Sequence, residues 1–133
     1  MKPERVDLHA VTEPHDIAQR VVQTRLREVE ALAYGLERRD EQRLHDFRIA
    51  CKRVRYALER FADLDGSFEA SAERFKALQD ALGEAHDRDV LLTILPPSMG
   101  KTQRRLQDER EQCVDRAAAL WKQPGGAGDS HEI

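Results

Sequence analysis

The sequence has few of the residues that shape tight turns, sheets and disulfide frameworks. Its 133 residues include 7 glycines, 5 prolines and 2 cysteines, and aromatic residues make up only 5%. A β-sandwich needs turn residues at regular intervals and an aromatic-rich core, so this composition argues against one. Charged residues reach 35% while hydrophobic residues keep 40%, which is typical of long solvated helices and not of a disordered chain. The composition predicts an all-α protein, and the length favours a single domain.

The sequence also lacks a long hydrophobic run. No stretch reaches the roughly 18 apolar residues that a membrane-spanning helix needs, and residues 1–10 contain no apolar signal core. We therefore expect a cytoplasmic protein with no membrane partner. The formal net charge is only −3, so any site for an anion must arise from local clustering of charge.

The two cysteines are far apart in sequence and form no CxxC pair. Cys51 and Cys113 each fall on an apolar face of a predicted helix. In a reducing compartment this position is typical of small buried hydrophobic residues, so we expect two free, buried thiols.

Apolar residues recur at helical spacing in four successive segments, which follow a polar lead over residues 1–11. The first predicted helix begins at a start signal made of Thr12 as a capping hydroxyl, Glu13 and Pro14. Its apolar residues continue at steps of three and four, so we expect it to extend to Glu37.

The second predicted helix has Asp40 as its cap and continues to about Asp63, with the most regular apolar seam in the chain. The third is expected to begin at Ser67 and to continue to residue 92 or 94, because a lone glycine such as Gly83 costs only about 1 kcal/mol in a helix.

The fourth predicted helix begins at Ser98, after a pair of prolines, and ends near Lys122. Residues 123–133 are rich in glycine and are predicted to be a disordered tail. Four helices over residues 12–122 with short connections favour an antiparallel up-down-up-down bundle.

One edge of the second predicted helix is cationic. Four side chains repeat with the same three-four spacing as the apolar seam: His45, Arg48, Lys52 and Arg55. Each is one residue later than a member of the seam, so the set is rotated by about 100° around the helix axis. We call this set the cationic stripe. It extends over roughly 15 Å and offers forked guanidinium donors and point charges to an extended anion.

The stripe is locally unbalanced in charge. Residues 43–60 contain six Lys or Arg and two acids, a local balance of +4 in a chain of net charge −3. A helix face built only for solubility would place acids four residues from the cations, but only Glu59 lies in line with the stripe. A plain solvated face is the open alternative. Further arginines lie beside the stripe: Arg43, Arg53 and Arg60.

The third predicted helix carries a matching polar line. Lys76, Gln79, Gly83 and His86 follow each other at steps of three, four and three. The two lines could face one another across a groove, where Gln79 donates to an anion and Gly83 lets it come near. The alternatives are an ordinary surface glutamine and a packing glycine.

Two blocks of this sequence resemble the CHAD domain family. They are residues 45–56, HDFRIACKRVRY, and residues 78–90, LQDALGEAHDRDV. The resemblance implies a helical bundle that binds inorganic polyphosphate through a basic groove, without catalysis and without a cofactor. It places His45, Arg48, Lys52, Arg53 and Arg55 on the basic positions of the first block. Lys76 precedes the second block, which includes Gln79 and His86.

The sequence departs from the family pattern in two ways. The second block usually has an arginine where this chain has His86, and a histidine is only fractionally charged near pH 7, so binding could depend on pH. The family's usual domain resembles two four-helix halves, whereas this chain has one, so we expect a homodimer. Asp87 and Asp89 would repel a polyanion and are expected to orient arginines or to cap the bundle interior instead.

Two rival functions stay open. The first is a metal site, if His45, His86, Asp87 and Glu84 converge in the bundle, although the Glu-x-x-His pairs of di-iron bundles are missing. The second is a nucleic-acid or regulatory interaction domain, because a cationic stripe attracts any phosphate. The sequence shows no GxxxxGK[ST] phosphate loop and no HExxH motif, so we expect no enzyme.

Overall fold

The computed structural model describes residues 2–123, and these residues fold into helices with no strands. This confirms the all-α prediction: four long helices pack against each other, and a short helix follows the first. The elements are α1 (Pro14–Leu32), α2 (Gly35–Arg38), α3 (Glu41–Arg60), the 3-10 helix η1 (Ala62–Leu64), α4 (Ser67–Ile94) and α5 (Gly100–Lys122).

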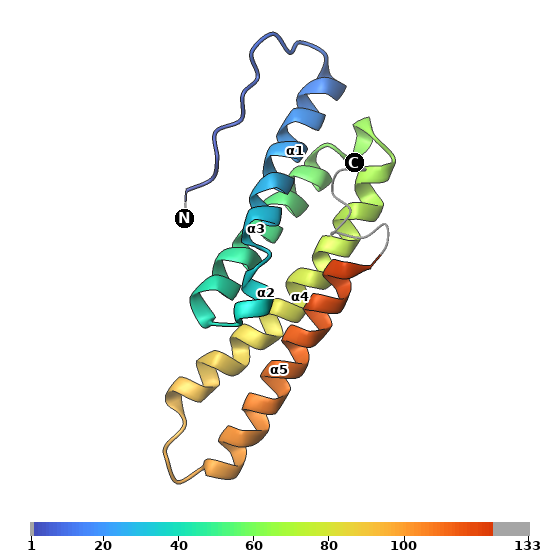
Figure 1. Cartoon of the computed structure of the whole chain (residues 1–133). Coiled ribbons are helices and arrows are strands. Elements are labelled where there is room, and N and C mark those ends of the chain that lie inside the picture. The colour runs from blue at the N-terminus through green and yellow to red at the C-terminus, as the bar shows by residue number, and fades with distance from the viewer. Residues whose placement is uncertain (1, 124–133) are drawn as a thin grey trace.

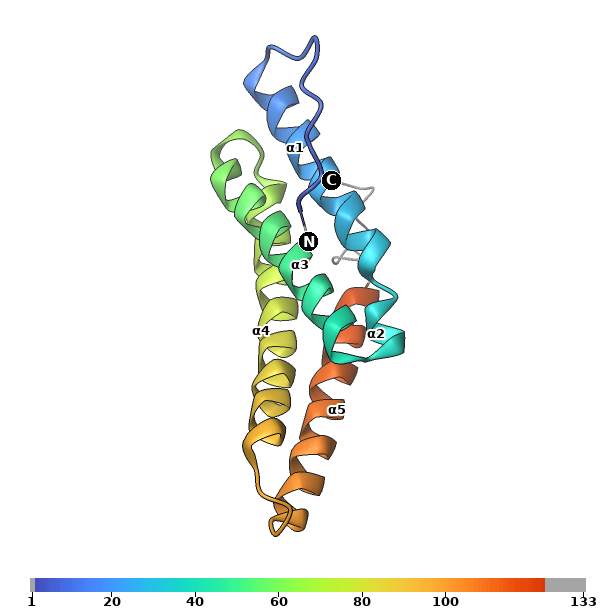
Figure 2. The same ribbon diagram turned by 90° about the vertical axis from the view of Figure 1, so that its left-hand side faces the viewer.

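Consecutive long helices run in opposite directions (Figure 1). Helix α1 packs on α3, α3 packs on α4, and α4 packs on α5. Both views show the hairpin of α4 and α5 extending beyond the start of α3, so that its connecting loop projects from one end of the molecule (Figures 1 and 2). The cationic stripe therefore lies on a helix that has α1 on one side and α4 on the other.

The core is built from the apolar seams that periodicity predicts. Phe47, Phe68 and Phe75 are fully buried, and the ring of Trp121 packs edge-on against Phe47 with 5.5 Å between ring centroids. The prediction of two free, buried cysteines is confirmed. Burial also raises the pKa of the Cys51 thiol, which keeps it protonated.

The prediction of one continuous first helix is wrong at its end. Helix α1 stops at Leu32, and the chain turns before α2 begins at Gly35. Here the amide of Leu36 bonds to the carbonyl of Ala33, three residues back, in place of the α-helical bond four residues back. A Cβ on Gly35 would lie 2.8 Å from the carbonyl oxygen of Arg43, so glycine lets α2 pack closely on the start of α3.

The predicted caps differ in outcome. The Asp40 cap is confirmed, because its side chain accepts a hydrogen bond from the Arg43 amide. Thr12 does not cap α1: the N-cap is Glu13, which makes no side-chain cap bond. Ser67 is the first residue of α4 and not its cap, and the Asp65 carboxylate accepts bonds from its amide and hydroxyl.

The remaining helix ends lie close to the predicted positions. Helix α3 ends at Arg60, with η1 before Asp65; α4 passes through Gly83 as expected, and α5 ends at Lys122. The predicted disordered tail lies outside the described residues, apart from Gln123. Among residues 2–123 no helix combines the length and apolarity that crossing a bilayer requires.

Candidate functional site: a polar groove between α3 and α4

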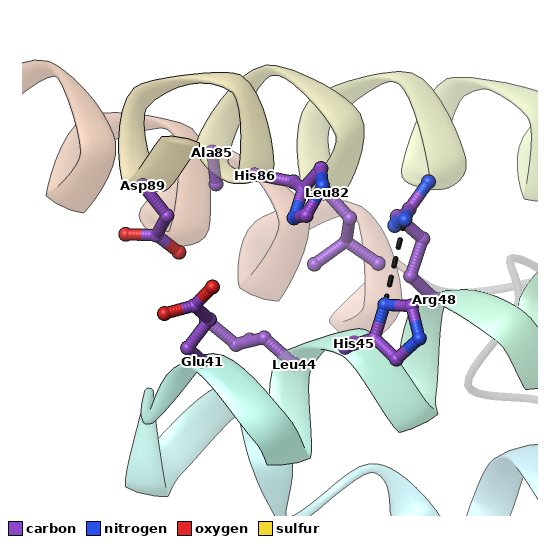
Figure 3. Close-up of a pocket in the computed structure, with 8 residues that line it drawn as sticks. All are labelled: Glu41, Leu44, His45, Arg48, Leu82, Ala85, His86 and Asp89. Atoms are coloured by element: carbon purple, nitrogen blue, oxygen red, sulfur yellow. Dashed lines mark hydrogen bonds between the residues drawn. The ribbon is translucent and has the colours of Figure 1, made fainter. Parts of the chain in front are cut away.

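A narrow pocket lies where the first half of α3 faces the second half of α4. Figure 3 shows His45, Arg48 and His86 at one end of this pocket and the carboxylates of Glu41 and Asp89 at the other. Its open volume of about 10 Å³ accommodates little more than one water molecule. An open depression of about 450 Å³ adjoins it. The depression is lined by Arg48, Gln79, Asp80, Gly83, Glu84, His86 and Asp87. We call the pocket and the depression together the α3–α4 groove.

Two residues belong to both parts of the groove. Arg48 from α3 and His86 from α4 line the pocket and the depression alike. A third residue joins them, because Arg48 Nη2 lies 3.5 Å from Nδ1 of His45 (Figure 3). The rings of His45 and His86 lie across the groove from each other, with 6.2 Å between centroids. The two polar lines predicted on separate helices therefore meet at these three side chains.

The groove has polar atoms that are buried but make no hydrogen bond within the described protein. These atoms are Nε of Arg48 and Oε1 of Gln79, and Nε of Arg55 farther along α3 is a third. Leaving a buried polar atom without a partner costs about 1–3 kcal/mol, and more for a charged group. An oxyanion that accepts from the two guanidinium groups would remove this cost, and so would a donor to Gln79.

An aromatic ring lies beside the last two cations of the stripe. The Lys52 ammonium lies 5.6 Å and the Arg55 guanidinium 5.0 Å from the centroid of the Tyr56 ring. Arg55 also lies 3.8 Å from a carboxylate oxygen of Glu59, whose side chain is half exposed. The Arg55 side chain is only 18% exposed, but this contact is too long for a hydrogen bond, so Arg55 is not locked to the acid. Sequence reasoning missed Tyr56, although it closes the first motif block.

Four predicted site residues do not line the groove: Lys52, Arg53, Arg55 and Lys76. Lys76 is exposed on α4, one helical turn before Gln79. Arg53 is half buried and is displaced by about 100° around α3 from its neighbour Lys52. The structure thus brings together His45, Arg48, Gln79 and His86, while Lys52 and Arg55 extend the line along α3.

The acids of the groove differ in their environment. Nε of Arg110, on α5, lies 2.8 Å from the Asp89 carboxylate, and the side chains of both are 13% exposed. Burial acts to lower the pKa of Arg110, but hydrogen bonds to Asp89 and Glu111 outweigh burial and raise it. The expectation that Asp89 orients an arginine is confirmed. Asp87 is exposed at the edge of the depression.

Sequence reasoning missed Arg110. It lies outside both motif blocks, on the helix with the weakest apolar seam, and its Nη2 also donates to the carbonyl of Arg39. No local pattern marks it, because its partners in the other helices are 21 and 71 residues away.

The metal alternative finds no geometric support in the described residues. His45 and His86 approach each other, but within residues 2–123 no three His, Cys, Asp or Glu side chains are grouped closely enough to hold a metal ion. The arginine between the histidines would also repel a cation.

Comparison with known proteins supplies one match. A family model described as CHAD domain matches residues 2–96, a span that includes α1 to α4 and leaves out α5. No curated protein and no solved structure matches the chain.

Proposed function

The chain belongs to the CHAD domain family, and from this premise we propose that its α3–α4 groove binds inorganic polyphosphate as a non-catalytic module. One observation carries the proposal: Arg48 sits at the junction of the pocket and the depression with its buried Nε unpaired. A charged donor in this state needs an acceptor, and a phosphate oxygen supplies one with opposite charge.

The shape of the cationic surface suits an extended anion. From His45 to Arg55 the stripe covers roughly 15 Å along α3, at about 1.5 Å per residue. Of its four members only Arg55 has an ion pair with a described residue, and that pair is long. A polyphosphate chain carries a negative charge on each phosphate, so one polymer could contact several of these groups in succession.

A pair of substitutions tests the site. In Arg48→Ala combined with Arg55→Ala, we expect polyphosphate affinity to fall about 100-fold, because each charge-assisted hydrogen bond contributes roughly 1.5 kcal/mol or more. The slope of log K against log salt concentration should become less negative by about 1 to 2. Calorimetric titration with chains of defined length measures both quantities, and circular dichroism checks that helix content is unchanged.

The matched control removes equal charge elsewhere. Arg38 and Arg74 are exposed and line neither part of the groove. The Arg38→Ala and Arg74→Ala pair lowers the net charge by the same amount, so it should keep nearly full affinity. Equal losses in both pairs would mean that binding follows overall charge, and the groove would not be the site.

Nucleic acid is the competing ligand, since the cations of the stripe attract any phosphate. Duplex DNA and long-chain polyphosphate compared at equal phosphate concentration separate the two. We expect DNA to displace little of the bound polyphosphate, because a single flexible chain can follow the stripe, whereas the phosphates of a duplex are held apart on a stiff helix. Efficient displacement would favour the nucleic-acid function.

We also propose that the protein works as a homodimer. The described residues form one four-helix unit, whereas the family's usual domain resembles two such halves. Twofold pairing is the commonest soluble assembly and would supply the second half. Light scattering at micromolar concentration checks this: monomer alone, with and without polyphosphate, would contradict it.

A further inference from the structure

The loop between α4 and α5 and the helix ends beside it contain no acidic residue. Residues 90–107, which we call the α4–α5 tip, have neither Asp nor Glu, although charged residues make up 35% of the chain. The tip does contain three cations, Lys101, Arg104 and Arg105. None of them forms an ion pair with another described residue. The tip is thus a second local concentration of positive charge, on a different part of the chain from the groove.

The same segment exposes hydrophobic side chains. The described residues include eight exposed large hydrophobic residues, and four of them lie within ten positions at the tip. They are Val90 at 45% exposure, Leu91 at 42%, Ile94 at 69% and Met99 at 41%. Isolated apolar residues on a surface need no explanation, but a cluster of this kind marks an interaction site.

The hairpin brings the apolar residues and the cations to the same end of the molecule. Figures 1 and 2 show the tip projecting beyond the rest of the bundle, so its loop is the end of the molecule. Ile94 is the last residue of α4, and Met99 directly precedes α5. The cations follow within the first six residues of α5, at most roughly 8 Å from its start. Ile94, Met99 and Lys101 therefore lie at the end of the hairpin. The other two apolar residues and the two arginines lie about one helical turn behind them.

We propose that the α4–α5 tip docks on the surface of an anionic lipid bilayer. Its apolar residues would enter the boundary between headgroups and acyl chains, where surface-seeking segments insert by about 5–10 Å. At that depth the three cations reach the phosphate layer, where each one adds attraction to anionic lipids. Docking of this kind needs no spanning helix. It departs from the expectation of no membrane partner, which rested on net charge and on the lack of a long apolar run.

The charges favour a bilayer over the other occupants. A second copy meeting the tip by twofold symmetry would bring three cations against three cations, which costs free energy. Free polyphosphate would satisfy the cations but would leave Ile94 and Leu91 in water. A projecting, convex end also suits a soft surface better than a rigid protein groove.

Flotation with lipid vesicles tests the proposal on the full chain. We expect binding to vesicles containing about one third phosphatidylglycerol, and none to phosphatidylcholine alone, at about 0.1 M salt. Ile94→Ser and Leu91→Ser should each lower the partition coefficient by about tenfold. Leu64→Ser is the matched control, since Leu64 is 41% exposed, like Leu91, but lies in η1 at the opposite end of the hairpin. It should bind as the wild type does.

Further variants test the role of the tip cations and the competing possibility of a dimer contact at the tip. Changing Arg104 and Arg105 to Gln should abolish flotation and leave the affinity for soluble polyphosphate unchanged, so this test can fail independently of the groove function. No binding to anionic vesicles, or equal binding by Ile94→Ser, would overturn the proposal. A dimer that Ile94→Ser dissociates would also overturn it, because a second copy would then bury the tip.

Discussion

The narrow pocket carries opposite charges at its two ends. Arg48 lies at one end, and Glu41 lies at the other, near Asp89 (Figure 3). Asp89 is compensated by Arg110, whereas Glu41 has no ion pair with a described residue. Glu41 is therefore the main repulsive charge toward a polyanion in the pocket, and it marks the end of the groove that phosphates should avoid.

Removing this repulsion should improve binding. We expect Glu41→Gln to raise polyphosphate affinity about threefold, because a like charge is taken from the exposed rim of the pocket. Calorimetric titration measures the change. Glu69→Gln, on an exposed acid in the first turn of α4, is the control for net charge. Equal affinities for Glu41→Gln and Glu69→Gln would show that phosphates do not approach the narrow pocket.

His86 lines both parts of the groove beside Arg48, at the position where the family pattern usually has an arginine. His86→Arg places a permanent cation there, so we expect polyphosphate affinity to rise at pH 8. Calorimetric titration measures the change. Unchanged affinity in the variant would show that the bound polymer does not contact this position.

At the scale of secondary-structure elements, two aspartates beside helix starts make the free energy of unfolding depend on pH. The hydrogen bond from the Arg43 side chain lowers the pKa of Asp40 at the start of α3, and the Ser67 hydroxyl lowers that of Asp65 before α4. A carboxyl whose pKa is lower in the folded state stabilises the protein above its unfolded pKa, and this stability is lost as the pH falls through the folded pKa.

We therefore expect the melting temperature to fall as the pH drops below about 4. Asp40→Asn keeps a capping side chain without the charge, so it should lower the melting temperature by a few degrees at pH 7 and make it less sensitive to acid. Thermal denaturation followed by circular dichroism at several pH values gives the comparison. An unchanged acid response in both Asp40→Asn and Asp65→Asn would place the acid-sensitive groups elsewhere.

The two glycines nearest the functional elements should respond in opposite ways to the same change. A Cβ on Gly35 would lie 2.8 Å from a backbone oxygen, whereas one on Gly83 would meet nothing within 4 Å. Gly35→Ala should lower the free energy of unfolding by about 1–3 kcal/mol, because α2 must move away from α3. Gly83→Ala should raise it by about 0.5–1 kcal/mol through helix propensity. Chemical denaturation measures both, and a stabilised Gly35→Ala would contradict the close packing of α2.

A substitution at Gly83 can also distinguish a packing role from a role in ligand binding. No neighbour among residues 2–123 explains this glycine, so the interpretation as a packing residue is wrong, and it borders the open depression. A more stable Gly83→Ala that also binds polyphosphate less tightly would indicate that the ligand approaches the backbone there.

Periodicity predicts the helices well because each seam is a local pattern. The run of apolar residues in α3 and α4 determines which faces are buried, and it places His45, Arg48, Gln79 and His86 beside the core on facing helices. The break after Leu32 is not visible in this pattern, since the apolar spacing continues across it. It depends on the fit between Gly35 and Arg43, which only the folded chain brings together.

At the scale of the whole molecule, α5 is outside the family match yet is tied into the bundle by ion pairs. Arg39, at the end of α2, pairs with Glu111 and Asp115 of α5. Burial acts to raise the pKa of Glu111, but hydrogen bonds from Arg39 and Arg110 outweigh burial and lower it. Arg110 adds bonds to Asp89 of α4 and to the Arg39 carbonyl, so one side chain joins three elements.

This connection makes α5 matter to the groove. Without Arg110, the negative charge of the largely buried Asp89 carboxylate would have no ion-pair partner. This carboxylate lines the same pocket as Arg48. Removing one partner of such a pair costs about 2–4 kcal/mol, and the freed charge would repel phosphate. We expect Arg110→Gln to lower the free energy of unfolding by that amount and to weaken polyphosphate binding several-fold, as measured by chemical denaturation and calorimetric titration.

The double variant distinguishes the two effects. In Asp89→Asn with Arg110→Gln the repulsive charge is gone, so polyphosphate affinity should return to the wild-type level. Stability should recover only in part, because the bond from Arg110 to the Arg39 carbonyl is still lost. Affinity that stays low in the double variant would mean that Arg110 acts by holding α5 in place. Affinity that never falls in Arg110→Gln would show that the charge of Asp89 does not reach the bound polymer.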